Sequence, residues 1–265
     1  MRRKIYDPSH HRLLYIDKKA SKKFWDEKWK SEATKIFANP PRHGWTMRIT
    51  RHYLAVGSRI LEGGCGLGDI VYALHNTGYE VEGIDYAPKV VKAINKNWPE
   101  LRVTEGDVRN LSFDDGFFDG YWSIGVIEHF PDGYGQIANE MRRVLRPDGY
   151  LFLSFPSFNP FRQARAADGK YNLISKESSA IDDFFQYALN PSEVQEHFEH
   201  IGFKLVDSRG IGALQCLEED TLFAAGVQRF INRFPSRVGT AISMVMDLII
   251  GHYAGHSCLL ILQKK

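Results

Sequence analysis

A glycine-rich turn and the acidic residue beside it have the spacing of a ligand site. The segment 59–69 opens with a short apolar run, places Glu62 at the end of that run, and then carries Gly64, Gly66 and Gly68 as G-x-G-x-G. An amphipathic helix pattern follows directly. Strand, glycine turn and helix N-terminus together let the backbone approach a ligand with no side chain in the way. Glu62 is then placed to accept a hydrogen bond from an ammonium or hydroxyl group of that ligand.

Two further carboxylates follow the next two apolar segments. Asp85 lies twenty-one residues after Gly64, the distance typical of a carboxylate that accepts hydrogen bonds from both ribose hydroxyls. Asp107 follows the third segment and could accept a hydrogen bond from the exocyclic amine of an adenine. A dinucleotide site has G-x-G-x-x-G, whereas here the third glycine comes one residue early and Asp69 follows it. Because Asp69 would repel a pyrophosphate, a cofactor without phosphate is favoured over NAD.

The elements that must position these residues alternate along the chain. Strands are predicted at 59–61, 80–84, 101–104, 118–126, 150–155, 203–206 and 257–263, with helix patterns between them. Residues 146–149 read Arg-Pro-Asp-Gly, which predicts a turn before the fifth strand. This alternation predicts a doubly wound, mostly parallel sheet, in which ligands bind at the carboxyl ends of the strands.

We expect a single domain over residues 1–265. It would comprise N-terminal helices at 20–55, a cofactor-binding core at 56–155, and two excursions at 156–190 and 210–256. The excursion at 156–190 is rich in Phe and Tyr without a period, and the one at 210–256 has a helical pattern. Three cysteines are too few and too scattered for a disulfide framework or a zinc site, so no metal is expected.

Charge is unevenly distributed, although the net charge is only +2. Residues 1–30 carry ten Lys/Arg against four Asp/Glu, or +6, which leaves −4 for the remainder. We expect this arm to be solvated and partly flexible, and nucleic-acid binding is disfavoured. The start of the chain lacks a secretory signal, and the apolar run 238–250 is too short for stable membrane insertion. A cytoplasmic location follows as the default expectation.

Five motifs follow one another between residues 59 and 155 in a characteristic order. They are Ile60-Leu61-Glu62-Gly63-Gly64-Cys65-Gly66-Leu67-Gly68, Gly83-Ile84-Asp85, Glu105-Gly106-Asp107-Val108, Ser123-Ile124-Gly125-Val126-Ile127-Glu128-His129 and Arg143-Val144-Leu145-Arg146-Pro147-Asp148-Gly149. With these motifs the segment resembles the class I S-adenosylmethionine-dependent methyltransferases, especially the small-molecule branch. The chain departs from the pattern at Gly63, where a bulkier residue is usual, and at Ala87, where a Ser or Thr would cap the next helix.

The resemblance implies a Rossmann-like seven-stranded sheet with the last strand antiparallel, helical lid insertions, and S-adenosylmethionine as cofactor. It also implies cofactor-binding roles for eleven residues. At the methionine moiety, Gly64 and Gly66 would pass beneath it, Glu62 would support its ammonium, and Ser123 and Ile124 would line it. Asp85 would bind the ribose, and the adenine would contact Tyr86, Asp107 and Val108. Trp25 and Trp29 would cover the cofactor from an N-terminal helix.

Methyl transfer from a sulfonium is an in-line displacement, so catalysis can come largely from positioning the acceptor and excluding water. A hydroxyl acceptor would also need a base for its proton. His129 follows the fourth predicted strand, beside the expected methyl group, and is our candidate base. The alternative, that His129 only shapes the pocket, stays open.

The two excursions are expected to cover the acceptor site, which favours an aromatic or lipid-like small molecule. Arg162, Arg165 and Lys170 could bind an anionic group on it. For the apolar helix over 238–250 we rank a lid first, a homodimer face second and a membrane contact third. The predicted function is methyl transfer to a small molecule, and the alternatives are an NAD-type oxidoreductase and a non-catalytic cofactor-binding module.

Overall fold

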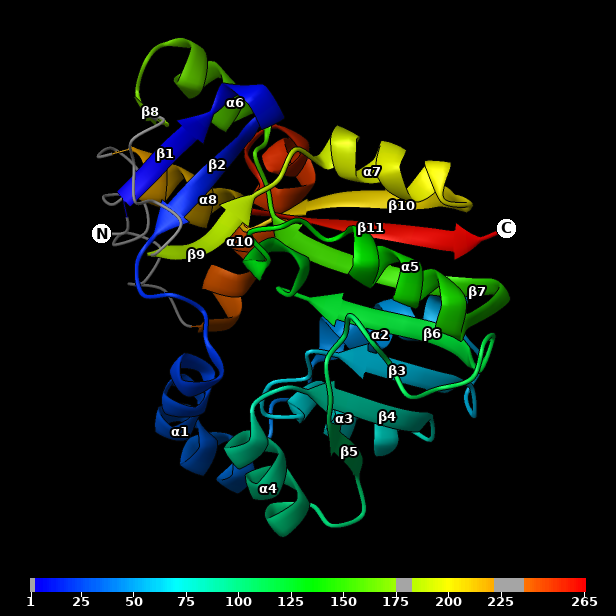
Figure 1. Ribbon diagram of the computed structural model, residues 1–265. Helices are drawn as coiled ribbons and strands as arrows, with labels where there is room; N and C mark the ends of the chain where they lie inside the picture. The colour runs from blue at the N-terminus through cyan, green and yellow to red at the C-terminus, as the bar shows by residue number, and fades with distance from the viewer. Residues whose placement is uncertain (1–2, 175–182, 222–235) are drawn as a thin grey trace.

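Seven strands form the central sheet of the protein. The computed structural model describes residues 3–174, 183–221 and 236–265. In sheet order the strands are β10 (Phe203–Ile211), β11 (Ser257–Lys264), β7 (Leu145–Pro156), β6 (Phe118–Ile124), β3 (Arg59–Gly63), β4 (Glu80–Asp85) and β5 (Arg102–Glu105) (Figure 1). β3, β4, β5, β6 and β7 pair in parallel, and β11 is antiparallel to both of its neighbours, β10 and β7. The predicted fold class is confirmed.

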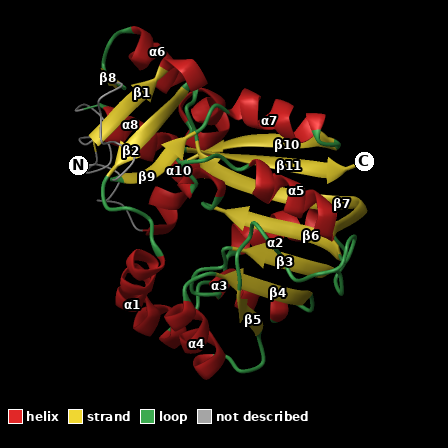
Figure 2. Cartoon of the chain, viewed as in Figure 1, coloured by secondary structure: helices red, strands yellow, loops and turns green. Residues whose placement is uncertain are grey.

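Helices cover both faces of this sheet (Figure 2). One face packs against α2 (Gly44–Tyr53), α3 (Asp69–His75) and α4 (Pro88–Asn97), and the other against α5 (Gly135–Val144) and α7 (Pro191–His200). Successive strand residues point to opposite faces, so Ile60 belongs to the first core and Leu61 to the second. Both side chains are fully buried, which explains why the strand is apolar without alternation.

One predicted turn lies inside a strand. Residues 146–149 belong to β7, which starts at Leu145 instead of Tyr150. The ladder pairs Phe118 with Leu145 and Gly120 with Tyr150, so extra residues bulge out of β7. Asp148 in the bulge has φ +61°, a left-handed conformation that turn-forming Asp tolerates. Residues 146–149 therefore form a bulge inside β7, and not a turn that precedes the strand.

A second sheet of four strands, sheet A, lies at one end of the central sheet (Figure 1). Its order is β8 (Asn172–Leu173), β1 (Arg3–Asp7), β2 (Arg12–Ile16) and β9 (Phe184–Ala188). The expectation of a solvated, flexible arm is wrong for residues 3–16, because Leu13, Leu14 and Tyr15 are buried. β1 and β2 form a hairpin around a 3-10 turn, η1 (Pro8–His10), which the Asp7 carboxylate caps by accepting from Ser9 N.

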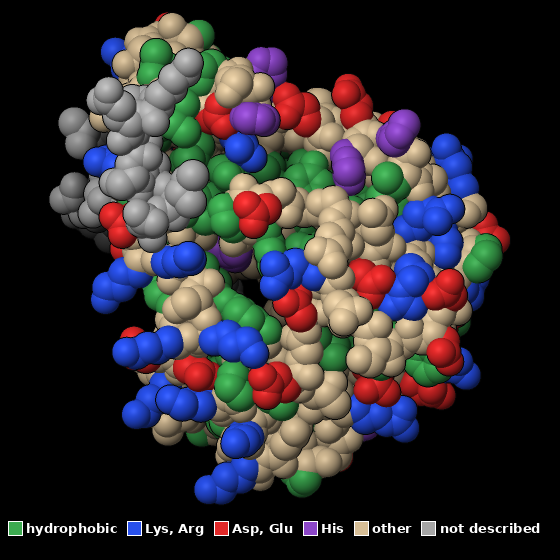
Figure 3. Space-filling view, in the orientation of Figure 1, with side chains coloured by type: hydrophobic (Ala, Val, Ile, Leu, Met, Phe, Trp, Pro, Cys, Tyr) green, Lys and Arg blue, Asp and Glu red, His purple; other side chains and the backbone are tan. Residues whose placement is uncertain are grey.

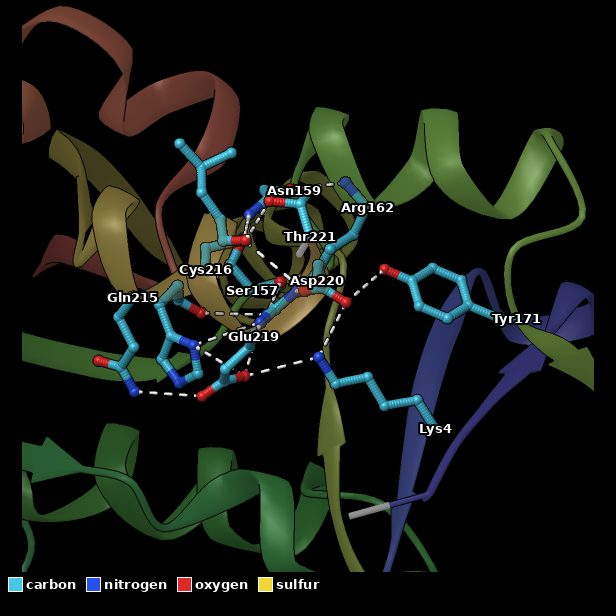
Figure 4. Close-up of polar contacts among 12 residues, drawn as sticks. Lys4, Ser157, Asn159, Arg162, Tyr171, Gln215, Cys216, Glu219, Asp220 and Thr221 are labelled. Atoms are coloured by element: carbon cyan, nitrogen blue, oxygen red, sulfur yellow. Dashed lines mark hydrogen bonds and ion pairs between the residues drawn. The ribbon is translucent and has the colours of Figure 1, made fainter. Parts of the chain in front are cut away.

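A buried polar cluster attaches sheet A to the excursions (Figure 4). Asp220, the last residue of α8 (Ala213–Asp220), accepts hydrogen bonds from Lys4 Nζ of β1 at 2.8 Å and from the Tyr171 hydroxyl at 2.9 Å. It also pairs with Arg162 Nε at 3.0 Å, from α6 (Pro160–Ala167). Figure 4 shows these side chains converging on one carboxylate from separate segments. Arg162 is fully buried in this network, so it is not placed to bind an anionic acceptor group as expected.

Two helices complete the described chain. α1 (Lys22–Ala38) lies at the edge of the molecule beside α4, and none of its residues is fully buried (Figure 1). α10 (Ser236–Ala254) packs against α8, α6 and β10. No helix within residues 3–174, 183–221 or 236–265 combines the length and apolar character needed to cross a bilayer.

Candidate active site

The glycine turn after β3 has a left-handed backbone conformation that hydrogen bonds to β4 hold in place. Gly64 and Gly66 have φ of +76° and +52°, values that side chains disfavour. The Gly64 and Cys65 amides donate to the carbonyl oxygen of Ile84 at 2.7 and 2.9 Å. The turn is therefore tied to the end of β4, and Gly64 and Gly66 bring no side chain of their own between its backbone and a ligand.

Asp85 fixes the same turn from the carboxyl end of β4. Its Oδ2 accepts from Gly66 N at 2.8 Å, and its Oδ1 accepts from Ala87 N at 2.9 Å. The second bond replaces the missing capping hydroxyl at Ala87. Burial raises the pKa of Asp85. Because an ionised carboxylate offers about four lone-pair directions, Asp85 can still accept hydrogen bonds from a ligand.

Several buried polar atoms have no hydrogen-bond partner among the described residues, and two of them lie at the carboxyl ends of strands beside the turn. They are Oε2 of Glu62, at the end of β3, and Oγ of Ser123, at the end of β6. Burial also raises the pKa of Glu62 well above its usual range. Since buried polar groups are nearly always satisfied, these atoms fit a site that a polar ligand completes.

The residues expected around an adenine lie at the carboxyl ends of β4 and β5. The Tyr86 hydroxyl donates to the Ala20 carbonyl at 2.8 Å, and Val108 is buried. Asp107 is partly exposed and forms a bidentate pair with Arg109, whose hydrogen bonds lower the pKa of this carboxyl. Sequence reasoning did not anticipate Arg109 as a partner. The adenine contacts of these residues stay a prediction.

Two tryptophans of α1 connect the glycine turn to His129. Trp25 and Trp29 stack with ring centroids 5.8 Å apart. A Cβ on Gly66 would lie 3.0 Å from Cζ2 of Trp29, so this ring covers the turn. Trp25 meets the His129 ring edge-on at 5.0 Å. Figure 3 shows the surface hollowed near the middle of this face, between α1 with its basic side chains and the body of the molecule.

His129 lies in η2 (Ile127–His129), a 3-10 turn after β6. Its Nδ1 is 2.8 Å from the carbonyl oxygen of Phe185 in β9. Because a carbonyl can only accept, the proton of the neutral ring is assigned to Nδ1, and Nε2 is left as the acceptor. Glu128 is buried with Oε1 3.8 Å from that Nε2, too far for a hydrogen bond. Burial raises the pKa of Glu128 to about 8.

Phe185 and Lys28 were not identified from the sequence as residues of the site. Phe185 orients His129 through its backbone, and its ring lies 5.0 Å from that imidazole and 5.6 Å from Phe24. Lys28 places its ammonium 4.6 Å from the centre of Trp25. The apolar run Leu13 to Ile16 was the signal available for sheet A, and hence for Phe185.

Comparison with known proteins identifies the family. A family model described as "Methyltransferase domain" matches residues 61–153. A ubiquinone biosynthesis O-methyltransferase of Xanthomonas euvesicatoria is 32% identical over 171 residues, covering 61% of this chain and 69% of the relative. The chain belongs to the class I S-adenosylmethionine-dependent methyltransferases.

Further similarities agree with this methyltransferase assignment. A demethylmenaquinone methyltransferase of Staphylococcus carnosus is 30% identical, covering 62% of this chain and 75% of the relative. A solved 1,6-didemethyltoxoflavin-N1-methyltransferase of Burkholderia thailandensis, with bound S-adenosylhomocysteine, shares the fold with a TM-score of 0.55. It is 17% identical, and the alignment covers 99% of each chain. S-adenosylmethionine is the cofactor, and the NAD-type and non-catalytic alternatives are set aside.

Proposed function

We propose that this methyltransferase methylates a hydroxyl group of a small aromatic acceptor, with His129 as general base. The observation that carries the proposal is the bond from His129 Nδ1 to the Phe185 carbonyl. It fixes the tautomer in which Nε2 can take a proton. A base of this kind is needed for a hydroxyl acceptor, and typically contributes a factor of about 10²–10⁴ to the rate.

The cofactor supplies an electrophilic methyl group when bound. In this proposal Glu62 accepts from its ammonium and Asp85 from its ribose. Gly64 and Gly66 pass beneath the methionine moiety, and Ser123 and Ile124 line it. Tyr86, Asp107 and Val108 contact the adenine, and Trp25 and Trp29 cover the cofactor. Supporting observations are the orphan Oε2 of Glu62 and Oγ of Ser123, which a ligand with donor groups would satisfy.

An aromatic acceptor is favoured by the side chains around His129. The rings of Phe185, Trp25 and Phe24 contact one another. The ring centroids of Phe185 and Trp25 each lie 5.0 Å from that of the His129 imidazole. Aromatic rings of this kind bind a flat apolar body by offset or edge-on packing. The quinone-type substrates that the names of the Xanthomonas and Staphylococcus relatives imply are consistent with such an acceptor.

A methyl-transfer assay with labelled S-adenosylmethionine and a panel of catechols and dihydroxybenzoates tests the proposal. His129→Asn keeps an amide that can donate to Phe185 but cannot act as a base. We expect it to lower turnover by about 10²–10⁴ while S-adenosylhomocysteine affinity stays unchanged. His75→Asn, an exposed histidine at the end of α3, is the matched control. Unchanged turnover in His129→Asn would refute the role of the base.

We also propose that α10 mediates a homodimer, in preference to the lid that we ranked first. Its outer face exposes Leu248 and Ile249, which are 84% and 70% accessible, beside Met244 and Val245. Light scattering on wild type and Leu248→Lys tests this, and a monomer in both would contradict it. The cytoplasmic location and the lack of nucleic-acid binding stay predictions.

A further inference from the structure

We propose that Trp25, Lys28 and Trp29 form a cation site for the sulfonium of S-adenosylmethionine, in which the lysine ammonium is the stand-in cation. Lys28 Nζ lies 4.6 Å from the ring centre of Trp25 and 4.7 Å from that of Trp29. Both distances are within the range in which a cation is attracted to the negative face of an indole. One positive charge thus contacts two rings at once.

The position of this aromatic pair points to the sulfonium. Trp29 covers Gly66 in the cofactor turn, and Trp25 touches His129, the proposed base. A methyl group that passes from cofactor to acceptor must lie between those two features, so the charged sulfur must lie near the two rings. This step rests on the proposed function, because it takes His129 to mark the acceptor side.

The spacing of the three residues explains how one helix makes the site. Positions 25, 28 and 29 share one face of α1, since residues three and four apart are neighbours on a helix. No residue of α1 is fully buried, and Trp25 and Trp29 pack partly against the domain core. Part of each ring therefore stays accessible over the site.

The site should distinguish the cofactor from its product. S-adenosylmethionine carries a positive sulfonium, whereas S-adenosylhomocysteine has a neutral thioether, because the sulfur keeps the bonding electron pair when the methyl group leaves. The rings therefore favour the cofactor over the product. Lys28 acts in the opposite direction, since its like charge must withdraw from the rings before the sulfonium takes its place.

Calorimetric affinities for the two ligands test this inference in the full chain. We expect Trp25→Leu to weaken S-adenosylmethionine binding about 3- to 30-fold more than S-adenosylhomocysteine binding. Lys28→Met should tighten S-adenosylmethionine binding several-fold, with little change for the product. Lys30→Met is the matched control and should change neither affinity, because Lys30 is an exposed lysine on the same helix that lies over no aromatic ring of the described residues.

Each outcome separates the inference from the proposed function. If Trp25→Leu and Lys28→Met change both affinities by the same factor, or not at all, the cation site is refuted while the methyltransferase site stands. If wild type binds neither ligand, both proposals fail. Because Lys28 lies outside the buried core, the result of Lys28→Met holds even where the tryptophan variant is unstable.

Discussion

Replacing Glu128 by Gln should stabilise the protein, and more so at high pH. This carboxyl is buried, its Oε2 has no partner among the described residues, and burial raises its pKa from 4.5 to about 8. Between these two pH values the folded protein holds a proton that the unfolded chain releases. The free energy of unfolding therefore falls as pH rises through this window, and the full penalty is present above about pH 8.

The pKa change sets the size of the effect. From about pH 5 to about pH 8, linkage gives a loss of at most about 4 kcal/mol that is specific to Glu128, because each pH unit contributes at most about 1.4 kcal/mol. Gln resembles the protonated carboxyl in shape and does not titrate, so Glu128→Gln should avoid this loss. Burial also raises the pKa values of Glu62 and Asp85, which both proteins retain. The difference between variant and wild type isolates Glu128.

Urea unfolding at the two pH values measures this difference. We expect Glu128→Gln to exceed wild type in free energy of unfolding at pH 8, with a smaller gap at pH 5. Glu140→Gln is the control of opposite sign, because hydrogen bonds from Arg143 lower the pKa of Glu140, and it should destabilise at pH 8. A Glu128→Gln variant no more stable than wild type at pH 8 would show that the folded protein accommodates the charge of Glu128, and would contradict this prediction.

Three further substitutions test other parts of the structure. Gly63→Ala should cost about 1–3 kcal/mol in urea unfolding, because its Cβ would overlap the Tyr121 hydroxyl and lie 2.7 Å from Cζ. A smaller cost in the Tyr121→Phe background is expected, and an equal cost would exclude this clash. Asp220→Ala should lower unfolding free energy by about 3–5 kcal/mol, since the buried Arg162 loses its buried carboxylate and keeps only the partly exposed Glu219 at 3.4 Å; a loss below about 1 kcal/mol would contradict this. Asp85→Ala should weaken S-adenosylhomocysteine binding at least about tenfold by calorimetry, because Gly66 N loses its acceptor, and unchanged affinity would argue against this anchor.

The central sheet and its ligand edge were predictable because their signals are local. Each strand of the core is a short apolar run, and the glycine turn and Asp85 follow strands directly. From the motif alone, Gly63 would only loosen the turn, but the structure gives another reason for a glycine there. Tyr121 fills the space beside it, a relation between residues far apart in sequence that one chain does not reveal.

Sheet A was not predictable because its pairing is non-local. Ile5 pairs with Asn172 and Leu14 with Tyr187, so no strand has its partners nearby except in the β1–β2 hairpin. Leu13 to Ile16 are buried on both faces and show no alternation, while the basic residues around them suggested a solvated arm. The contact to His129 was hidden for another reason. A backbone carbonyl, as at Phe185, has no signature in residue types.

Binding of S-adenosylhomocysteine to wild type and to Gly66→Val tests most directly whether the cofactor occupies the glycine turn after β3. At a hundredfold excess over Kd the ligand should add about 2.7 kcal/mol to the stability of wild type, seen as a raised melting temperature. Gly66 has φ +52° and lies under Trp29, so valine there should abolish the shift while the variant stays folded. An equal shift in both proteins would place the cofactor elsewhere and contradict the account.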